Sequence, residues 1–158
     1  IVLTAYTGYR AIIIELSEVL LETDARELYM RFSTDGGSNF DATGYSFAGF
    51  TLGDSTGGAN QVFRQSGSAN QIGMTGTIIG NAATEGIDIT VKLMNRTNTA
   101  LLTKATWNGA FIGNGATPES YLTQGMGSRE TAQDTDAVRF LASGDNLASG
   151  KYAVYGLL

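Results

Sequence analysis

The stretch that decides the fold runs Leu28-Tyr29-Met30-Arg31-Phe32-Ser33-Thr34-Asp35-Gly36-Gly37-Ser38-Asn39-Phe40. In its first six residues an apolar side chain stands at every second position, which is typical of a strand with one buried face and one wet face. Two glycines follow, and glycine adopts positive φ without a steric clash, while Asp and Ser side chains bond to nearby backbone amides. The sequence therefore predicts a hairpin turn stabilised by Ser33, Asp35, Gly36, Gly37 and Ser38.

The remainder of the chain repeats this pattern of short apolar runs and turns. Glycine occurs 21 times and proline once, and the glycines separate the runs at spacings typical of sandwiches and barrels. At 158 residues the chain fits one domain, so we expect a single antiparallel all-β domain over residues 1–158. Strands are expected at residues 1–7, 10–17, 28–33, 44–52, 61–65, 75–79, 87–94, 101–112, 137–142 and 151–158.

Two of these strands carry the clearest signal. Residues 87–94 alternate strictly between apolar and polar side chains, as an antiparallel strand between core and water does. In residues 101–112, Trp107 and Phe111 fall on the same face of the expected strand. We expect both to anchor the core, and the alternative is an exposed aromatic platform. Loops are expected at residues 18–27, 53–59 and 113–129, and turns at residues 143–146 and 149–150, because these segments are polar or glycine-rich.

The composition disfavours several classes of function. Only 16% of the residues are charged, the net charge is −5, and the ten basic residues are scattered, so no nucleic-acid footprint is present. His and Cys are both absent, which excludes Ser-His-Asp and Cys-His catalysis and thiolate or imidazole metal sites. No apolar run approaches the roughly 20 residues of a membrane-spanning helix, so no membrane insertion is expected.

Three site hypotheses stand beside purely structural interpretations. Asp35, Asn39 and Asp41 could bind calcium, although their simpler interpretation is turn stabilisation. An exposed Tyr45, Tyr121 or Trp107 beside Asn and Asp side chains could stack on a sugar, although each is also a natural core or interface residue. Paired carboxylates could cleave a glycosidic bond, and the candidates are Glu15, Glu18, Glu22, Glu27, Asp54, Asp134 and Asp136.

Two resemblances add to this picture. The run Ser33-Thr34-Asp35-Gly36-Gly37-Ser38-Asn39-Phe40 resembles the Asp box of sialidase-like proteins, in which Asp and Ser stabilise a hairpin turn away from the active centre. A sialidase propeller needs several copies, an arginine triad and a longer chain, so the resemblance implies a turn and no activity.

The second resemblance covers both ends of the chain. Residues 9–16, the run 28–40, the strand that starts near Tyr45, and residues 138–157 look like a family of tailed-bacteriophage virion proteins found in tail fibres, spikes and other surface components. The most specific part is the ending Ser149-Gly150-Lys151-Tyr152-Ala153-Val154-Tyr155-Gly156-Leu157. The resemblance implies a jelly-roll-like β-sandwich on the surface of a phage particle, where homo-oligomers, trimers among them, are common.

We therefore expect a non-enzymatic virion structural protein, either a capsid decoration protein or a fibre component, that packs against other virion proteins. No catalytic residue, cofactor or metal is assigned to it. Recognition of a host-surface glycan by a phage tail module is the alternative, and an enzyme that cleaves such a glycan is a third hypothesis. The expected contact elements are the loops 53–59 and 113–129, with the candidate interface residues Tyr121, Met126, Arg129 and Tyr155.

Overall fold

Eleven strands and no helix make up the part of the chain that the computed structural model describes, residues 1–4, 8–55, 58–115, 117 and 119–158. Residues 5–7, 56–57, 116 and 118 belong to the expected first strand and to two expected loops, and they lie outside the described residues. None of the described segments is a helix able to cross a membrane. The strands are β1 (Val2–Thr4), β2 (Ala11–Leu21), β3 (Leu28–Ser33), β4 (Tyr45–Ser55), β5 (Gly58–Ala69), β6 (Ile72–Gly73), β7 (Gly86–Met94), β8 (Lys104–Ile112), β9 (Ser120–Arg129), β10 (Ala137–Ala142) and β11 (Leu147–Leu157).

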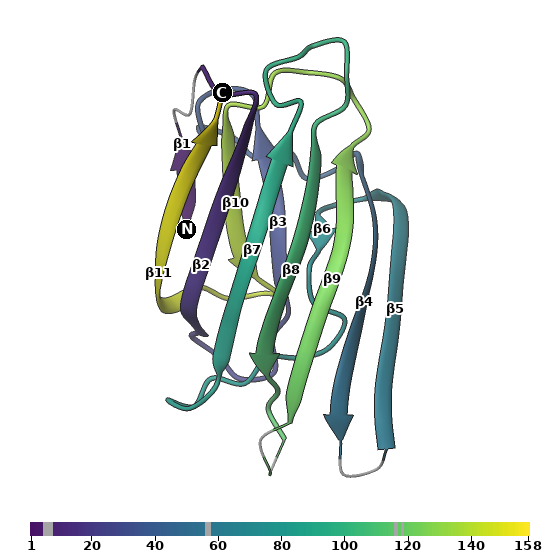
Figure 1. The fold of residues 1–158 in the computed structure, drawn as a ribbon, viewed down its shortest axis with the longest axis vertical. Coiled ribbons are helices and arrows are strands. Elements are labelled where there is room, and N and C mark those ends of the chain that lie inside the picture. The colour runs from purple at the N-terminus through teal and green to yellow at the C-terminus, as the bar shows by residue number, and fades with distance from the viewer. Residues whose placement is uncertain (5–7, 56–57, 116, 118) are drawn as a thin grey trace.

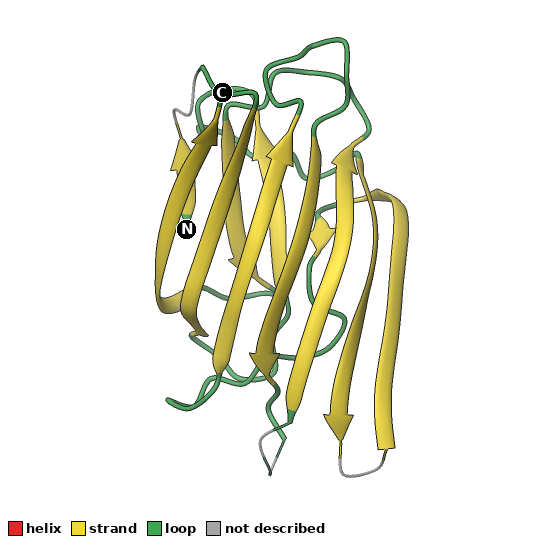
Figure 2. Ribbon diagram, viewed as in Figure 1, coloured by secondary structure: helices red, strands yellow, loops and turns green. Residues whose placement is uncertain are grey.

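The strands form two antiparallel sheets that lie face to face (Figure 1). The smaller sheet has four strands in the order β1-β10-β3-β6, and the larger has seven in the order β11-β2-β7-β8-β9-β4-β5. Figure 2 shows that loops connect the strands mainly at the two ends of the sandwich. The predicted antiparallel β-sandwich is confirmed.

The order of the strands is jelly-roll-like because the chain repeatedly changes sheet. From the N-terminus β1, β2 and β3 alternate between the two sheets, and β10 and β11 do the same at the C-terminus. Strands from the two ends then pair with each other, β1 with β10 and β2 with β11. The chain thus closes on itself from both termini, as jelly rolls do.

The core lies between the sheets and comes from the alternation that the sequence displays. Along β7 buried and exposed side chains alternate without interruption, as predicted. Trp107 and Phe111 of β8 are each only 3% exposed and belong to the core, so the prediction of core anchors is confirmed and neither ring forms an exposed platform.

The expected loop 113–129 is wrong for its second half, which is the strand β9. Its glycines had suggested a loop, but they are required by close packing inside the sandwich. A Cβ at Gly125 would lie 2.3 Å from Cζ2 of Trp107, and a Cβ at Gly127 would lie 2.8 Å from Cγ2 of Ile72. Glycine here makes room for large neighbours while the backbone keeps its ladder with β8 and β4.

The expected hairpin after β3 is also wrong, although the turn itself is present. β3 belongs to the four-stranded sheet and β4 to the seven-stranded sheet, so the turn leads the chain from one sheet to the other. The rings of Phe32 in β3 and Tyr45 in β4 meet edge to face across the core, with centroids 5.8 Å apart. The apolar faces of the two strands therefore pack together, and no hydrogen-bonded ladder joins them.

Several other boundaries differ from the expectation. β2 continues to Leu21, through an irregular pairing around Glu18 that returns Val19 and Leu21 to the core. β4 and β5 extend into the expected loop 53–59, and residues 149–150 lie within β11 at a break in its register. The expected strand 75–79 contributes only an isolated bridge at Ile79, and the two-residue strand β6 was not predicted.

Candidate binding faces of the seven-stranded sheet

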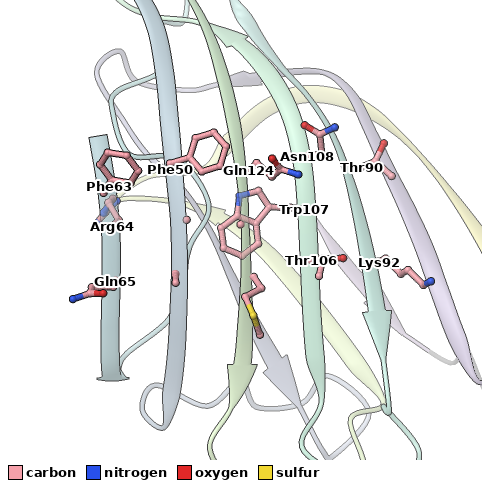
Figure 3. Close-up of a pocket in the computed structure, with 14 residues that line it drawn as sticks. Phe50, Phe63, Arg64, Gln65, Thr90, Lys92, Thr106, Trp107, Asn108 and Gln124 are labelled. Atoms are coloured by element: carbon pink, nitrogen blue, oxygen red, sulfur yellow. The ribbon is translucent and has the colours of Figure 1, made fainter. Parts of the chain in front are cut away.

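The outer face of the seven-stranded sheet carries two rows of side chains that cross five strands. Register pairs from β5 to β7 define the first row, which consists of Phe63, Phe50, Gln124, Asn108 and Thr90. The second row lies beside it and consists of Gln65, Ala48, Met126, Thr106 and Lys92. Figure 3 shows the first row running directly across the strands.

These two rows line a shallow groove of about 1060 Å³, which we call the outer groove. Phe63 is 76% exposed and lies beside Phe50, with ring centroids 6.4 Å apart and planes tilted by 48°. Trp107 also lines the groove although it is buried, because Gly49 and Gly125 leave only backbone between its ring and the outside. The groove is therefore aromatic at its β5 end and polar toward β7.

A second accessible region is the strand β11, which forms one edge of the same sheet. Eight of its eleven residues are exposed. From Lys151 to Leu157 its register with β2 is unbroken, so this part of the edge is straight. Tyr152 of β11 also lines a hollow of about 420 Å³ between this edge and the N-terminal strand, together with Ile1, Val2 and Arg139. We call this region the β11 edge.

The candidate interface residues divide into two groups. Met126 is 45% exposed on the outer face, and Tyr155 is 51% exposed on the β11 edge. Tyr121 and Arg129 are only 6% and 7% exposed, so their expected place on an open loop is wrong. Both point inward from β9, where Tyr121 stacks on Phe111 with centroids 5.1 Å apart and Arg129 forms an ion pair with Asp41.

The five turn residues lie together at the end of β3 as expected. The Ser33 hydroxyl donates to the Asp35 carboxylate at 2.7 Å and accepts the Gly37 N–H at 3.0 Å. The same carboxylate accepts the backbone and side-chain N–H groups of Asn39 at 2.8 and 2.7 Å, and Ser38 N–H donates to the Asp35 carbonyl. Gly36 and Gly37 have φ of 72° and 86°. These bonds, those from Asn39 first, lower the pKa of Asp35 to about 2.

Most of the candidate carboxylates form ion pairs or accept hydrogen bonds within the chain. Glu27 pairs with Arg64 at 2.6 Å across the two sheets, and Asp136 accepts the Gly36 N–H at 2.9 Å. Glu18 pairs with Lys151, while Glu22 and Glu15 accept bonds from Asn146 and Tyr155. Within the described residues no group of three or more acidic side chains could hold a metal ion.

Tyr45, Tyr121 and Trp107 are all buried, which confirms the core interpretation for these three residues and contradicts the alternative that they stack on a sugar. The exposed ring of the outer face is instead Phe63, and the half-buried Phe50 lies beside it; no sequence pattern had indicated either residue as a binding residue. Their alternation with Thr51 and Val62 marks them as outward-facing residues. Their position beside Gln124 and Asn108 depends on the order of the strands in the sheet, and this order cannot be predicted from a local sequence pattern.

Comparison of the chain with protein-family models, with curated proteins and with solved structures found no match.

Proposed function

We propose that this chain is a non-enzymatic structural protein of a tailed-bacteriophage particle, and that the β11 edge is the surface by which it binds neighbouring virion proteins. The phage role rests on the resemblance of residues 28–40 and 138–157, and the observation that supports the binding surface is the exposure of β11 along an unbroken register. An uncovered edge strand has one row of backbone N–H and C=O groups without a ladder partner, and another chain can pair with it.

The side chains of β11 suit burial against a protein. Tyr152 and Tyr155 are large, exposed and amphipathic, and such aromatic residues are enriched at the centre of protein interfaces. The single charge on the strand, Lys151, forms an exposed ion pair with Glu18, which contributes little to stability. A neighbour that adds a strand here and fills the adjoining hollow would bury Tyr152, and its side chains on the opposite face of the sheet would cover Tyr155. Repetition on a symmetric particle would multiply such weak contacts.

The proposal is tested by measuring how well variants of the chain are incorporated into phage particles. In Tyr155→Asp a charge stands at the centre of the proposed contact, and Leu101→Asp places the same charge on an exposed apolar residue of the loop between β7 and β8. We expect mass spectrometry of purified particles to detect the wild type and Leu101→Asp, and Tyr155→Asp to be strongly depleted. Absence of the wild-type chain from the particles would contradict the proposed role.

A second candidate function, recognition of a host-surface glycan, is favoured by the outer groove. The two functions are compatible because the groove spans β5 to β7 while β11 lies at the opposite edge, beyond β2. A particle protein held by β11 would keep its groove open to solvent.

A further inference from the structure

The geometry points to the outer groove as a binding site for a polysaccharide segment several sugar units long. This inference deepens the second candidate function and is independent of the first, because binding can be measured on the isolated chain. The first row crosses five strands, and four strand spacings of about 4.8 Å give a length of roughly 19 Å. A groove of that length accommodates an extended oligomer better than a single small molecule.

The polar side chains of the groove are available to a ligand. Gln65, Thr90, Thr106, Asn108 and Gln124 all line the groove and make no side-chain hydrogen bond to any described residue. Their amides and hydroxyls both donate and accept, which is the combination that matches the hydroxyl groups of a sugar. By contrast, the inward-facing hydroxyl of Thr51 is engaged, because it accepts the Gly76 N–H at 2.8 Å.

The aromatic end of the groove supplies the second element of sugar recognition. Pyranose rings have an apolar face made of C–H groups, and this face packs on aromatic rings. Phe63 and Phe50 offer two adjacent rings, and Phe63 is 76% exposed in a chain that buries Phe32, Phe111 and Phe140. Exposed aromatic surface of this kind beside convergent polar groups is characteristic of ligand sites.

The charge of the groove decides between a polysaccharide and other polymers. Lys92 is the only charged side chain of the two outward rows. Arg64 also lines the groove but pairs with Glu27, and none of the described lining residues is a carboxylate. Nucleic acid requires a track of several cations, which is absent from the lining. A polymer of hydroxyl groups with few carboxylates fits this balance, and Lys92 would receive a carboxylate at the β7 end.

The chain has a single tryptophan, Trp107, which lies beneath the groove floor and serves as a reporter of binding. The experiment first applies the isolated protein to an array of neutral and acidic bacterial surface polysaccharides. It then titrates the most strongly retained polysaccharide while the fluorescence of Trp107 is followed. Neutral and acidic hits differ in the effect of Lys92→Gln, which weakens binding only to an acidic polymer.

We expect the wild type to bind at least one polysaccharide with a change in fluorescence. Phe63→Ala and Gln124→Ala should each weaken binding by about tenfold or more, which corresponds to about 1.4 kcal/mol. Leu101→Ala is the matched control and should bind as the wild type does. Both test positions are exposed, and equal thermal unfolding temperatures of the three variants would confirm that each is folded.

Three results would overturn the inference. The first is a wild-type protein that is retained by no polysaccharide on the array. The second is binding that persists unchanged in Phe63→Ala and Gln124→Ala, which would place the ligand elsewhere. The third is a wild-type dimer that Phe63→Ala converts to a monomer in light scattering, since the groove would then be covered by a second copy of the chain.

Discussion

The hydroxyl of Tyr45 accepts the backbone N–H of Phe32 at 2.8 Å and thereby ties the seven-stranded sheet to the four-stranded sheet. The same hydroxyl lies 3.2 Å from the carbonyl of Asp41, to which it can donate. The rings of Tyr45 and Phe32 are both fully buried. One side chain therefore joins the two sheets by packing and holds the chain where it crosses between them.

We predict that Tyr45→Phe lowers the free energy of unfolding by about 1–3 kcal/mol, because it leaves the buried N–H of Phe32 without an acceptor while the ring remains. Urea denaturation measures this change. Tyr155→Phe is the control, since its hydroxyl is exposed and lies 3.3 Å from Glu15, and we expect a change within about 0.5 kcal/mol. Equal effects of the two substitutions would contradict the role assigned to Tyr45.

The turn at Asp35 should contribute to the pH dependence of stability. Its pKa is about 2 in the folded chain against an ordinary value of 3.8, so the folded state favours the ionised carboxylate. The resulting stabilisation is complete above about pH 4 and is lost as the pH falls toward 2. We predict that the stability difference between wild type and Asp35→Asn shrinks over this interval in urea denaturation. A difference that stays constant from pH 5 to pH 2 would rule out this explanation.

Gly125 should tolerate no side chain. A Cβ there would lie 2.3 Å from the Trp107 ring, 2.7 Å from the Ala48 carbonyl and 2.8 Å from Cα of Gly49. We predict that Gly125→Ala destabilises the protein by about 1–3 kcal/mol through overpacking and shifts the Trp107 emission. Gly67→Ala, where a Cβ meets nothing within 4 Å, should change stability by less than about 0.5 kcal/mol in the same thermal unfolding measurement. Similar losses for both would show that the contact with Trp107 is not the cause.

The sequence predicted the fold class well where alternation was unambiguous. Residues 87–94 and 104–112 alternate because each strand separates core from water, and that pattern is local. The turn residues Ser33 and Asp35 were likewise identifiable, because a turn closes over a few neighbouring residues. β9 was not predicted because its glycines are required by close contacts with Trp107 and Ile72, which are distant in the chain.

The candidate site was much less predictable. Phe63, Gln124 and Thr90 meet in one row only because β5, β4, β9, β8 and β7 stand in that order, and the order is set by long-range pairing. Tyr121 shows the converse case. The polar segment around it suggested an exposed loop. In the structure its side chain lies on the inward face of β9 and packs against Phe111 in the core.

The most direct test of the proposed role is amine labelling of the chain in intact phage particles and in isolation. The chain has three lysines, of which Lys151 lies on the β11 edge, Lys92 in the outer groove and Lys104 at one end of β8. We predict that Lys151 reacts in the isolated chain and is protected in the particle, while Lys92 and Lys104 react in both. Equal reactivity of Lys151 in the two states would contradict it.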